Sequence, residues 1–166
     1  MADTSSISII MDCQDVEGAS ELQGFGKGIE LLTYSHAIKH DVTLDPSNGT
    51  RTIGKASHGD FTIEKYFDLS SCKLIHKCNT GNEIKKVEVK VLQSVGDLKP
   101  MLTYTMEHVV ITEIACICSG ADKPRETVRM TYTRIQWIYE PQDKDTEKRG
   151  KDSAEYNLAR ASGRPA

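Results

Sequence analysis

The feature that most constrains this chain is residues 54–81, where a strand pattern leads directly into one short helix. Phe61, Ile63 and Phe67 recur at even spacing, and polar residues such as Thr62 lie on the opposite face. Alternation with period two is typical of a half-buried strand. The chain therefore needs a sheet with one apolar face at this point.

A short helix follows a turn at residues 68–71, whose Asp and Ser side chains can accept the free N–H groups of a first helical turn. Residues 79–81, Asn-Thr-Gly, supply the stop. Between these signals, apolar residues fall three and four positions apart and predict one apolar stripe: Cys72, Leu74, Ile75 and Cys78. One helix in a strand-rich chain predicts a sheet or barrel that this helix covers on an open side.

Further strand patterns recur along the chain, at residues 7–11, 29–38, 87–91, 101–118, 126–140 and 154–160. The segment 101–118 is either one long strand or two. In 126–140 the apolar phase changes from even positions, as at Val128, to odd positions, as at Ile135. This change predicts a bulge near Thr133 that curves the sheet, as barrels require. The fold class expected is mostly antiparallel β with one short α-helix, in one domain spanning 1–166.

Two segments do not fit the strand pattern. Residues 39–58 are expected to be a long extended loop, with turn chemistry at its centre in Asp-Pro-Ser-Asn-Gly, residues 45–49. A long loop in a compact domain is usually functional, mobile or held by a partner. The tail from about residue 161 is expected to be loose. The charged segment 141–152 is expected to be a solvated loop.

Composition excludes several classes of function. The chain has 166 residues, 38% of them hydrophobic, which suits one core. A net charge of −3 and a pI near 6.0 give no electrostatic case for binding nucleic acid or an anionic membrane. No apolar run approaches the ~20 residues of a membrane helix. The first residues lack the basic and apolar parts of a secretory signal. Five cysteines, an odd number, indicate a reducing cytosol.

Candidate chemistry is weak. Cys116 and Cys118 share a strand face, and Cys72 lies one helical turn from His76, so together they would satisfy the ligand count of a tetrahedral zinc site. No Cys-x-x-Cys knuckle is present, and free cysteine is usually a buried core residue. The pair Glu107 and Glu113 could flank a substrate, but such charges usually form the wet face of a sheet. We expect no catalytic residues, no metal and no cofactor.

The residues also carry a family resemblance. Five blocks follow one another in family order: GIELLTYSHAI at 28–38, GKASHGDFTIEKYFDLSSCKL at 54–74, CNTGNEIKKVEVKV at 78–91, YTMEHVVITEI at 104–114 and ETVRMTYTRIQWIYEPQD at 126–143. In combination, the Gly-Lys-Ala entry and the terminal Trp-x-Tyr-x-Pro-Gln-Asp motif are specific. The chain resembles the haemolysin-coregulated protein (Hcp) family, the tube protein of bacterial type VI secretion systems.

The resemblance implies a small antiparallel β-barrel with one flanking helix, similar in architecture to phage tail-tube proteins. It implies self-assembly into a six-membered ring and stacking of rings into a tube. The partners it implies are the sheath, spike and baseplate proteins of the system, with effector proteins as cargo in the lumen. It implies a protein made in the bacterial cytoplasm and exported by the type VI system without a signal peptide.

Particular residues acquire roles from the resemblance. The small side chains of Thr33, Ser35 and Ala37 lie on one strand face, which from the residues alone could meet water, a close neighbour or a lumen. In the family this strand lines the channel. The segment 39–58 matches an arm that packs on the neighbouring subunit and the adjacent ring. Four residues are our candidates for its contacts: Asp45, Asn48, Arg51 and Thr52.

Two other classes of function compete with this reading. A monomeric β-barrel binding module would use 39–58 or 141–152 as its recognition edge. A cytosolic metal-dependent enzyme would use the Cys and His residues and would hold stoichiometric zinc.

Overall fold

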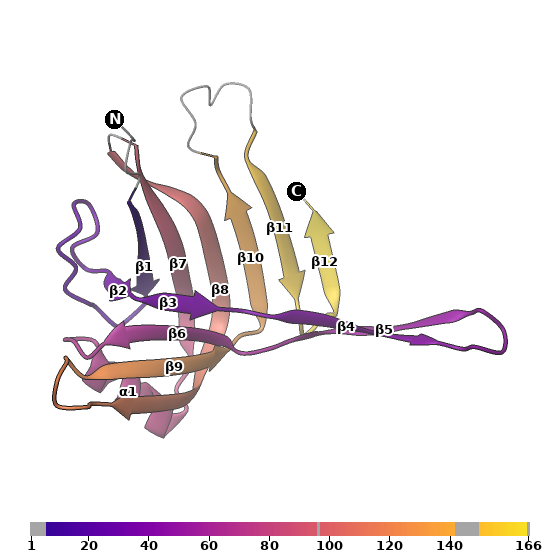
Figure 1. Ribbon diagram of the computed structural model, residues 1–166, viewed down its shortest axis with the longest axis horizontal. Helices are drawn as coiled ribbons and strands as arrows, with labels where there is room; N and C mark the ends of the chain where they lie inside the picture. The colour runs from indigo at the N-terminus through magenta and orange to yellow at the C-terminus, as the bar shows by residue number, and fades with distance from the viewer. Residues whose placement is uncertain (1–5, 96, 142–149, 166) are drawn as a thin grey trace.

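The computed structural model describes residues 6–95, 97–141 and 150–165, and most of them lie in antiparallel strands (Figure 1). One helix, α1, covers Ser71–Thr80. The strands in chain order are β1 (Ile7–Cys13), β2 (Ile29–Leu31), β3 (Thr33–Ser35), β4 (Ile38–Leu44), β5 (Arg51–His58), β6 (Phe61–Tyr66), β7 (Ile84–Val95), β8 (Asp97–Ile117), β9 (Arg125–Thr131), β10 (Arg134–Tyr139), β11 (Asp152–Asn157) and β12 (Ser162–Pro165).

Two layers of strands share the long strand β8. Its first half pairs with β7 and β10, within the order β12-β11-β10-β8-β7-β1-β2. Its second half pairs with β9, which continues to β6 and β3. Figure 1 shows β3, β6 and β9 crossing the strands of the first layer at a steep angle. The change of partner occurs around His108, whose φ of 55° interrupts the regular strand.

A second junction joins the same two layers. The chain runs from β2 to β3 across Leu32, whose backbone N–H donates to the carbonyl of Glu64 at 2.8 Å. With β8 at one corner and this junction at the other, the strands wrap into a barrel-like fold around one core. The predicted fold class, mostly antiparallel β with one helix, is confirmed.

The core comes from the alternating residues of both layers. Buried members include Met11, Ile29, Phe61, Ile63, Leu74, Val87, Val89, Met106, Val109, Ile111, Val128, Met130 and Ile135. Each such side chain contributes about 1.5–3 kcal/mol when it leaves water. The stripes expected in 61–63 and 87–91 therefore do face the interior. The stripe expected in 7–11 does so only in part, because Met11 is buried but Ile7 is 60% exposed.

The helix ends as expected, with Gly81 in the left-handed conformation at φ 66°. Its buried stripe begins one residue earlier than predicted, however, because Ser71 and Leu74 are buried while Cys72 is exposed. The prediction that Cys72 belongs to the apolar stripe is therefore wrong. Phe67 was also misplaced: it lies beyond β6 and is 42% exposed. At the start of the helix, the polar side chain of Ser71 occupies the inward position instead.

Segments 101–118 and 126–140 differ in the number of strands that they form. The first lies within one long strand, β8. The second is two strands, β9 and β10, separated at Tyr132 and Thr133, so the predicted bulge is in fact a break. The break is needed because β9 pairs with β6 whereas β10 pairs with β11. Segment 29–38 likewise divides into β2, β3 and the start of β4.

Two expectations about irregular segments were wrong. Residues 39–58 are not a loop, because they form the β4–β5 hairpin. The tail from about 161 is not loose throughout, because β12 pairs with β11 from Ser162 to Pro165. The hairpin and β12 are held by backbone hydrogen bonds between strands, which the residue types in these segments do not predict. Of the charged segment 141–152, positions 142–149 lie outside the described residues, and Asp152 begins β11.

Candidate assembly interface

The β4–β5 hairpin, here called the arm, is a two-stranded sheet separate from the rest of the strands. Figure 1 shows it projecting far from the barrel. Every residue of β4 is exposed, and so are most residues of β5. An isolated hairpin of this kind is marginally stable in water. Among the described residues, the arm therefore lacks the packing that would make it rigid.

The two faces of the arm differ in chemistry. Val42 pairs with Ile53, and Leu44 pairs with Arg51. Cross-strand partners share a face, and so do positions two apart along a strand. Val42, Leu44 and Ile53 are 56%, 58% and 68% exposed, so together they form an apolar arm face. Thr43 and Thr52, which are paired, lie on the opposite, polar face.

The arm tip is a hydrogen-bonded turn organised by Asp45. Its Oδ1 accepts from the Ser47 backbone N–H at 2.9 Å and from the Ser47 hydroxyl at 2.6 Å. These hydrogen bonds lower the pKa of the Asp45 carboxyl. Gly49 completes the turn with φ 63°. Asp45 and Asn48 thus lie in the turn itself, Arg51 lies on the apolar arm face, and Thr52 on the polar one.

The β3 region shows the alternation expected of 33–37. Thr33, Ser35 and Ala37 are exposed. Between them Tyr34 points toward the core and stacks on Phe61 with ring centroids 5.7 Å apart. The three small residues therefore form one exposed face, beside the point where the arm leaves the barrel.

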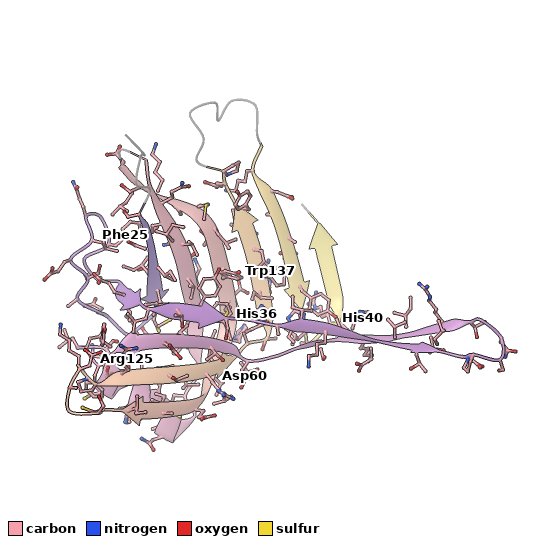
Figure 2. All side chains as sticks on the ribbon, viewed as in Figure 1. Phe25, His36, His40, Asp60, Arg125 and Trp137 are labelled. Carbon is pink, nitrogen blue, oxygen red and sulfur yellow. The ribbon has the colours of Figure 1, made fainter. Side chains whose placement is uncertain are left out.

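At the root of the arm, two histidines converge on one tyrosine. His36 precedes β4 and His58 ends β5. The Tyr132 hydroxyl lies 2.5 Å from His36 Nε2 and 2.8 Å from His58 Nδ1. Figure 2 shows His36 where β3 passes into the arm, with Trp137 on β10 nearby. The sequence analysis did not find this cluster, because its members are far apart in the chain and no motif links them.

Burial changes the pKa values of the three side chains at the root of the arm. It lowers the pKa of His36, and the neighbouring imidazole of His58 lowers it further. Burial also lowers the pKa of His58. The Tyr132 phenol has a raised pKa, through burial and then through the charge of Asp60. The neutral forms of all three side chains are therefore favoured in the folded protein.

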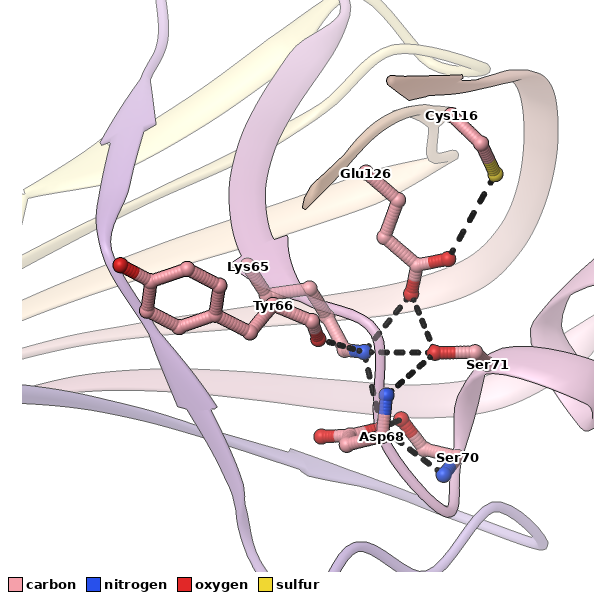
Figure 3. Close-up of polar contacts among 7 residues, drawn as sticks. All are labelled: Lys65, Tyr66, Asp68, Ser70, Ser71, Cys116 and Glu126. Carbon is pink, nitrogen blue, oxygen red and sulfur yellow. Dashed lines mark hydrogen bonds and ion pairs between the residues drawn. The ribbon is translucent and has the colours of Figure 1, made fainter. Parts of the chain in front are cut away.

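A second polar cluster lies beneath the start of α1 (Figure 3). Lys65 is fully buried, and its Nζ lies 2.7 Å from Glu126 Oε1, 2.8 Å from Asp68 Oδ1 and 3.0 Å from Ser71 Oγ. Ser71 also donates to Glu126 Oε1 at 2.8 Å. Burial opposes the charge of Asp68, but hydrogen bonds from Lys65 and Ser70 outweigh it and lower its pKa. This cluster fastens β6, β9 and α1 together.

The two carboxylates considered as a catalytic pair each face an arginine. Glu107 pairs with Arg134 at 3.0 Å, and Glu113 faces Arg129 at 3.6 Å, so the two carboxylates do not converge. Among the described residues, no three His, Cys, Asp or Glu side chains are grouped to hold a metal ion. Within the same ranges, no helix has both the length and the apolar character needed to cross a bilayer.

Comparisons with known proteins agree on one family. Residues 10–139 match the family model "Type VI secretion system effector, Hcp". Protein hcp1 of Pseudomonas aeruginosa strain PAO1 is 23% identical over 147 residues, which cover 87% of this chain and 90% of that protein.

Solved structures agree with the fold. One described as a type six secretion system protein has a TM-score of 0.87 at 23% identity, covering 96% of this chain and all of that one. Hcp1 from Salmonella typhimurium has a TM-score of 0.79 at 19% identity, covering 96% and 99%. Because the family model spans most of its length, the chain belongs to the Hcp family of type VI secretion proteins, which are structural, secreted tube proteins and not enzymes.

Proposed function

We propose that this protein is a tube subunit that forms six-membered rings, that the rings stack, and that effector proteins travel in the lumen. The observation that carries the proposal is the arm. Its apolar face of Val42, Leu44 and Ile53 is exposed, and nothing in the described chain covers it. Exposed apolar surface of this kind marks an interaction site.

The partner that fits the arm is a second copy of the chain. A contact between the arm and a different surface of the next copy is heterologous, and such contacts close into a ring when the rotation between copies allows it. Asp45, Asn48, Arg51 and Thr52, at and beside the tip, are our candidates for contacts within or between rings. The exposed face of Thr33, Ser35 and Ala37 is our candidate for the channel lining, because small polar side chains leave room for cargo.

The wider setting follows from the family. We infer that residues 1–166 act as a single Hcp-like domain and that the sheath, spike and baseplate proteins of the system are its partners. The protein is made in the bacterial cytoplasm and exported by the type VI system. The alternative that keeps the same fold is a monomeric binding module that uses the arm as its recognition edge.

Mass measurement separates these two functions. Light scattering on a sizing column, with negative-stain images of the peak, should give a six-fold mass and annular particles. Ile53→Glu, which places a charge on the apolar arm face, should reduce the mass to that of a monomer. Lys39→Glu, at an exposed position of β4 that is neither on the apolar arm face nor among the candidate contacts, is the control and should keep the ring. A wild-type protein that stays monomeric at all concentrations would favour the binding module.

A further inference from the structure

The arm is joined to the barrel through an unusual contact, in which two imidazoles share one phenol. His36 precedes β4 and His58 ends β5, so both lie where the hairpin joins the barrel. A ring nitrogen of each lies close to the Tyr132 hydroxyl, at 2.5 Å for His36 and 2.8 Å for His58. Tyr132 itself is buried at the break between β9 and β10. We propose that His36, His58 and Tyr132 form an acid-sensitive joint, which holds the arm root at neutral pH and loosens it when the imidazoles gain protons.

Counting protons shows why the neutral joint is satisfied. A phenol offers one O–H donor and accepts through its oxygen, and a neutral imidazole has one N–H and one acceptor nitrogen. The Tyr132 hydroxyl can therefore donate to one imidazole and accept from the other. When both imidazoles are protonated, neither can accept. The phenol proton then loses its partner within the joint, and two cations stand with ring centroids 5.8 Å apart.

The described side chains that pack against the two imidazoles are mainly aromatic. His58 stacks on Tyr156 of β11 with centroids 4.9 Å apart, and both imidazoles lie beside Trp137 of β10, at 6.3 Å and 6.2 Å. Phe61 of β6 packs 5.5 Å from His36. Among the described residues, Asp60 is the acidic group whose charge acts on Tyr132, and it accepts a hydrogen bond from Thr112. One carboxylate against two imidazolium groups leaves an excess of positive charge in a partly buried site.

The sign of the pH effect follows from linkage. Both histidines have a lowered pKa in the closed joint, so the open arm binds protons more tightly than the closed one. The closed joint is fully stable above the ordinary histidine pKa of about 6.5 and loses stability as pH falls from there toward the lowered values. Below the lowered values there is no further loss. Each unit of pKa difference multiplies the opening equilibrium about tenfold.

The chain carries its own reporter of the joint. Trp137 is its single tryptophan, and it contacts both imidazoles. Its emission would be followed from about pH 7.5 to about pH 5, with hydrogen exchange of the arm peptides measured at the same points and corrected for the intrinsic rate. We expect a titration of the emission, with arm exchange rising several-fold over the same interval. A flat emission and unchanged corrected exchange would overturn the proposal.

Three variants assign the effect. His36→Asn with His58→Asn keeps polar side chains without titration and should make both readouts independent of pH. His40→Asn with His76→Asn, which removes one histidine from the arm and one from α1, should titrate as the wild type does. An acid response that persists in the first pair, or disappears in the second, would refute the assignment.

Tyr132→Phe provides an independent test if the double variant of His36 and His58 fails to fold. It leaves the arm sequence unchanged, so intrinsic exchange rates cancel. It should raise arm exchange several-fold already at neutral pH, and unchanged exchange would contradict the joint. Recording the mass at each pH separates opening of the arm from dissociation of a ring. Failure of this test therefore leaves the proposed assembly untouched, and a monomeric protein would still report on the joint.

Discussion

The arm and the Lys65 cluster lie at opposite extremes of how this chain uses polar and apolar groups. In the cluster, a buried ammonium meets the side chains of Glu126, Asp68 and Ser71, all within the same chain. In the arm, apolar side chains stand in solvent on a two-stranded sheet. The cluster is complete within one chain, whereas the arm, on the assembly that we propose, is completed by a partner.

The difference separates folding from assembly. Changes in the cluster should act on the free energy of unfolding, since a buried charge that loses its partner is expensive. Changes in the arm should act on the mass of the particle, since surface substitutions alter stability little. The predictions below test that separation, from the largest expected effect to the smallest.

The largest effect is expected for Lys65→Met. It leaves Glu126 buried without its counter-charge and should lower the free energy of unfolding by about 3–5 kcal/mol. Urea denaturation at fixed protein concentration measures this loss. The matched control adds Glu126→Leu, which removes both charges and should recover most of the loss. A single substitution that costs less than about 1 kcal/mol would show that the cluster contributes little to stability.

An intermediate result is expected when residues 44–52 are replaced by a short Gly-Ser turn. Tube growth and secretion should be abolished, because the tip is removed together with Leu44 of the apolar arm face. The free energy of unfolding of this variant should lie within about 1 kcal/mol of that of a monomeric arm variant such as Ile53→Glu. Sizing, electron microscopy and a secretion assay provide the readouts. Normal secretion by this variant would break the comparison, because the arm would then have no role in assembly.

The smallest effect on both stability and assembly is expected for Ser35→Arg. This position is neither buried nor part of the arm, and its neighbours Thr33 and Ala37 are exposed. The ring mass should be unchanged, while cargo retention should change because a long cation would enter the channel. Co-purification of effectors with the ring is the measurement. Loss of the ring itself would show that this face meets another subunit and not the lumen.

Much of the fold was predictable, because its alternation is set by burial within one chain. Val87, Val89 and the strand from Phe61 to Ile63 face the core as their pattern indicated. The Lys65 cluster was also signalled, although the sequence analysis passed over it. Lys65 follows Phe61 and Ile63 at the same spacing, and Glu126 precedes Val128 and Met130 in the same way. Opposite charges at inward positions of two strands predict a buried ion pair.

What the sequence analysis missed depends on contacts that one segment cannot report. The turn residues at 45–49 predict a loop over 39–58, and the turn at Asp45 is present, but the flanking residues pair as strands. The edge strand at Ser162–Pro165 contains Gly and Pro, which disfavour strands, and its order comes from the backbone of β11. The arm root joins His36, His58 and Tyr132 across the chain, and only the folded topology brings them together.

The strand β8 has a mechanical consequence. One continuous run from Asp97 to Ile117 belongs to both layers of the barrel. A force that pulls the layers apart at this corner is therefore carried by covalent bonds of the backbone, not by a row of hydrogen bonds between neighbouring strands. If the protein is expelled as part of a tube, as we propose, this corner is where the barrel should best resist being pulled apart.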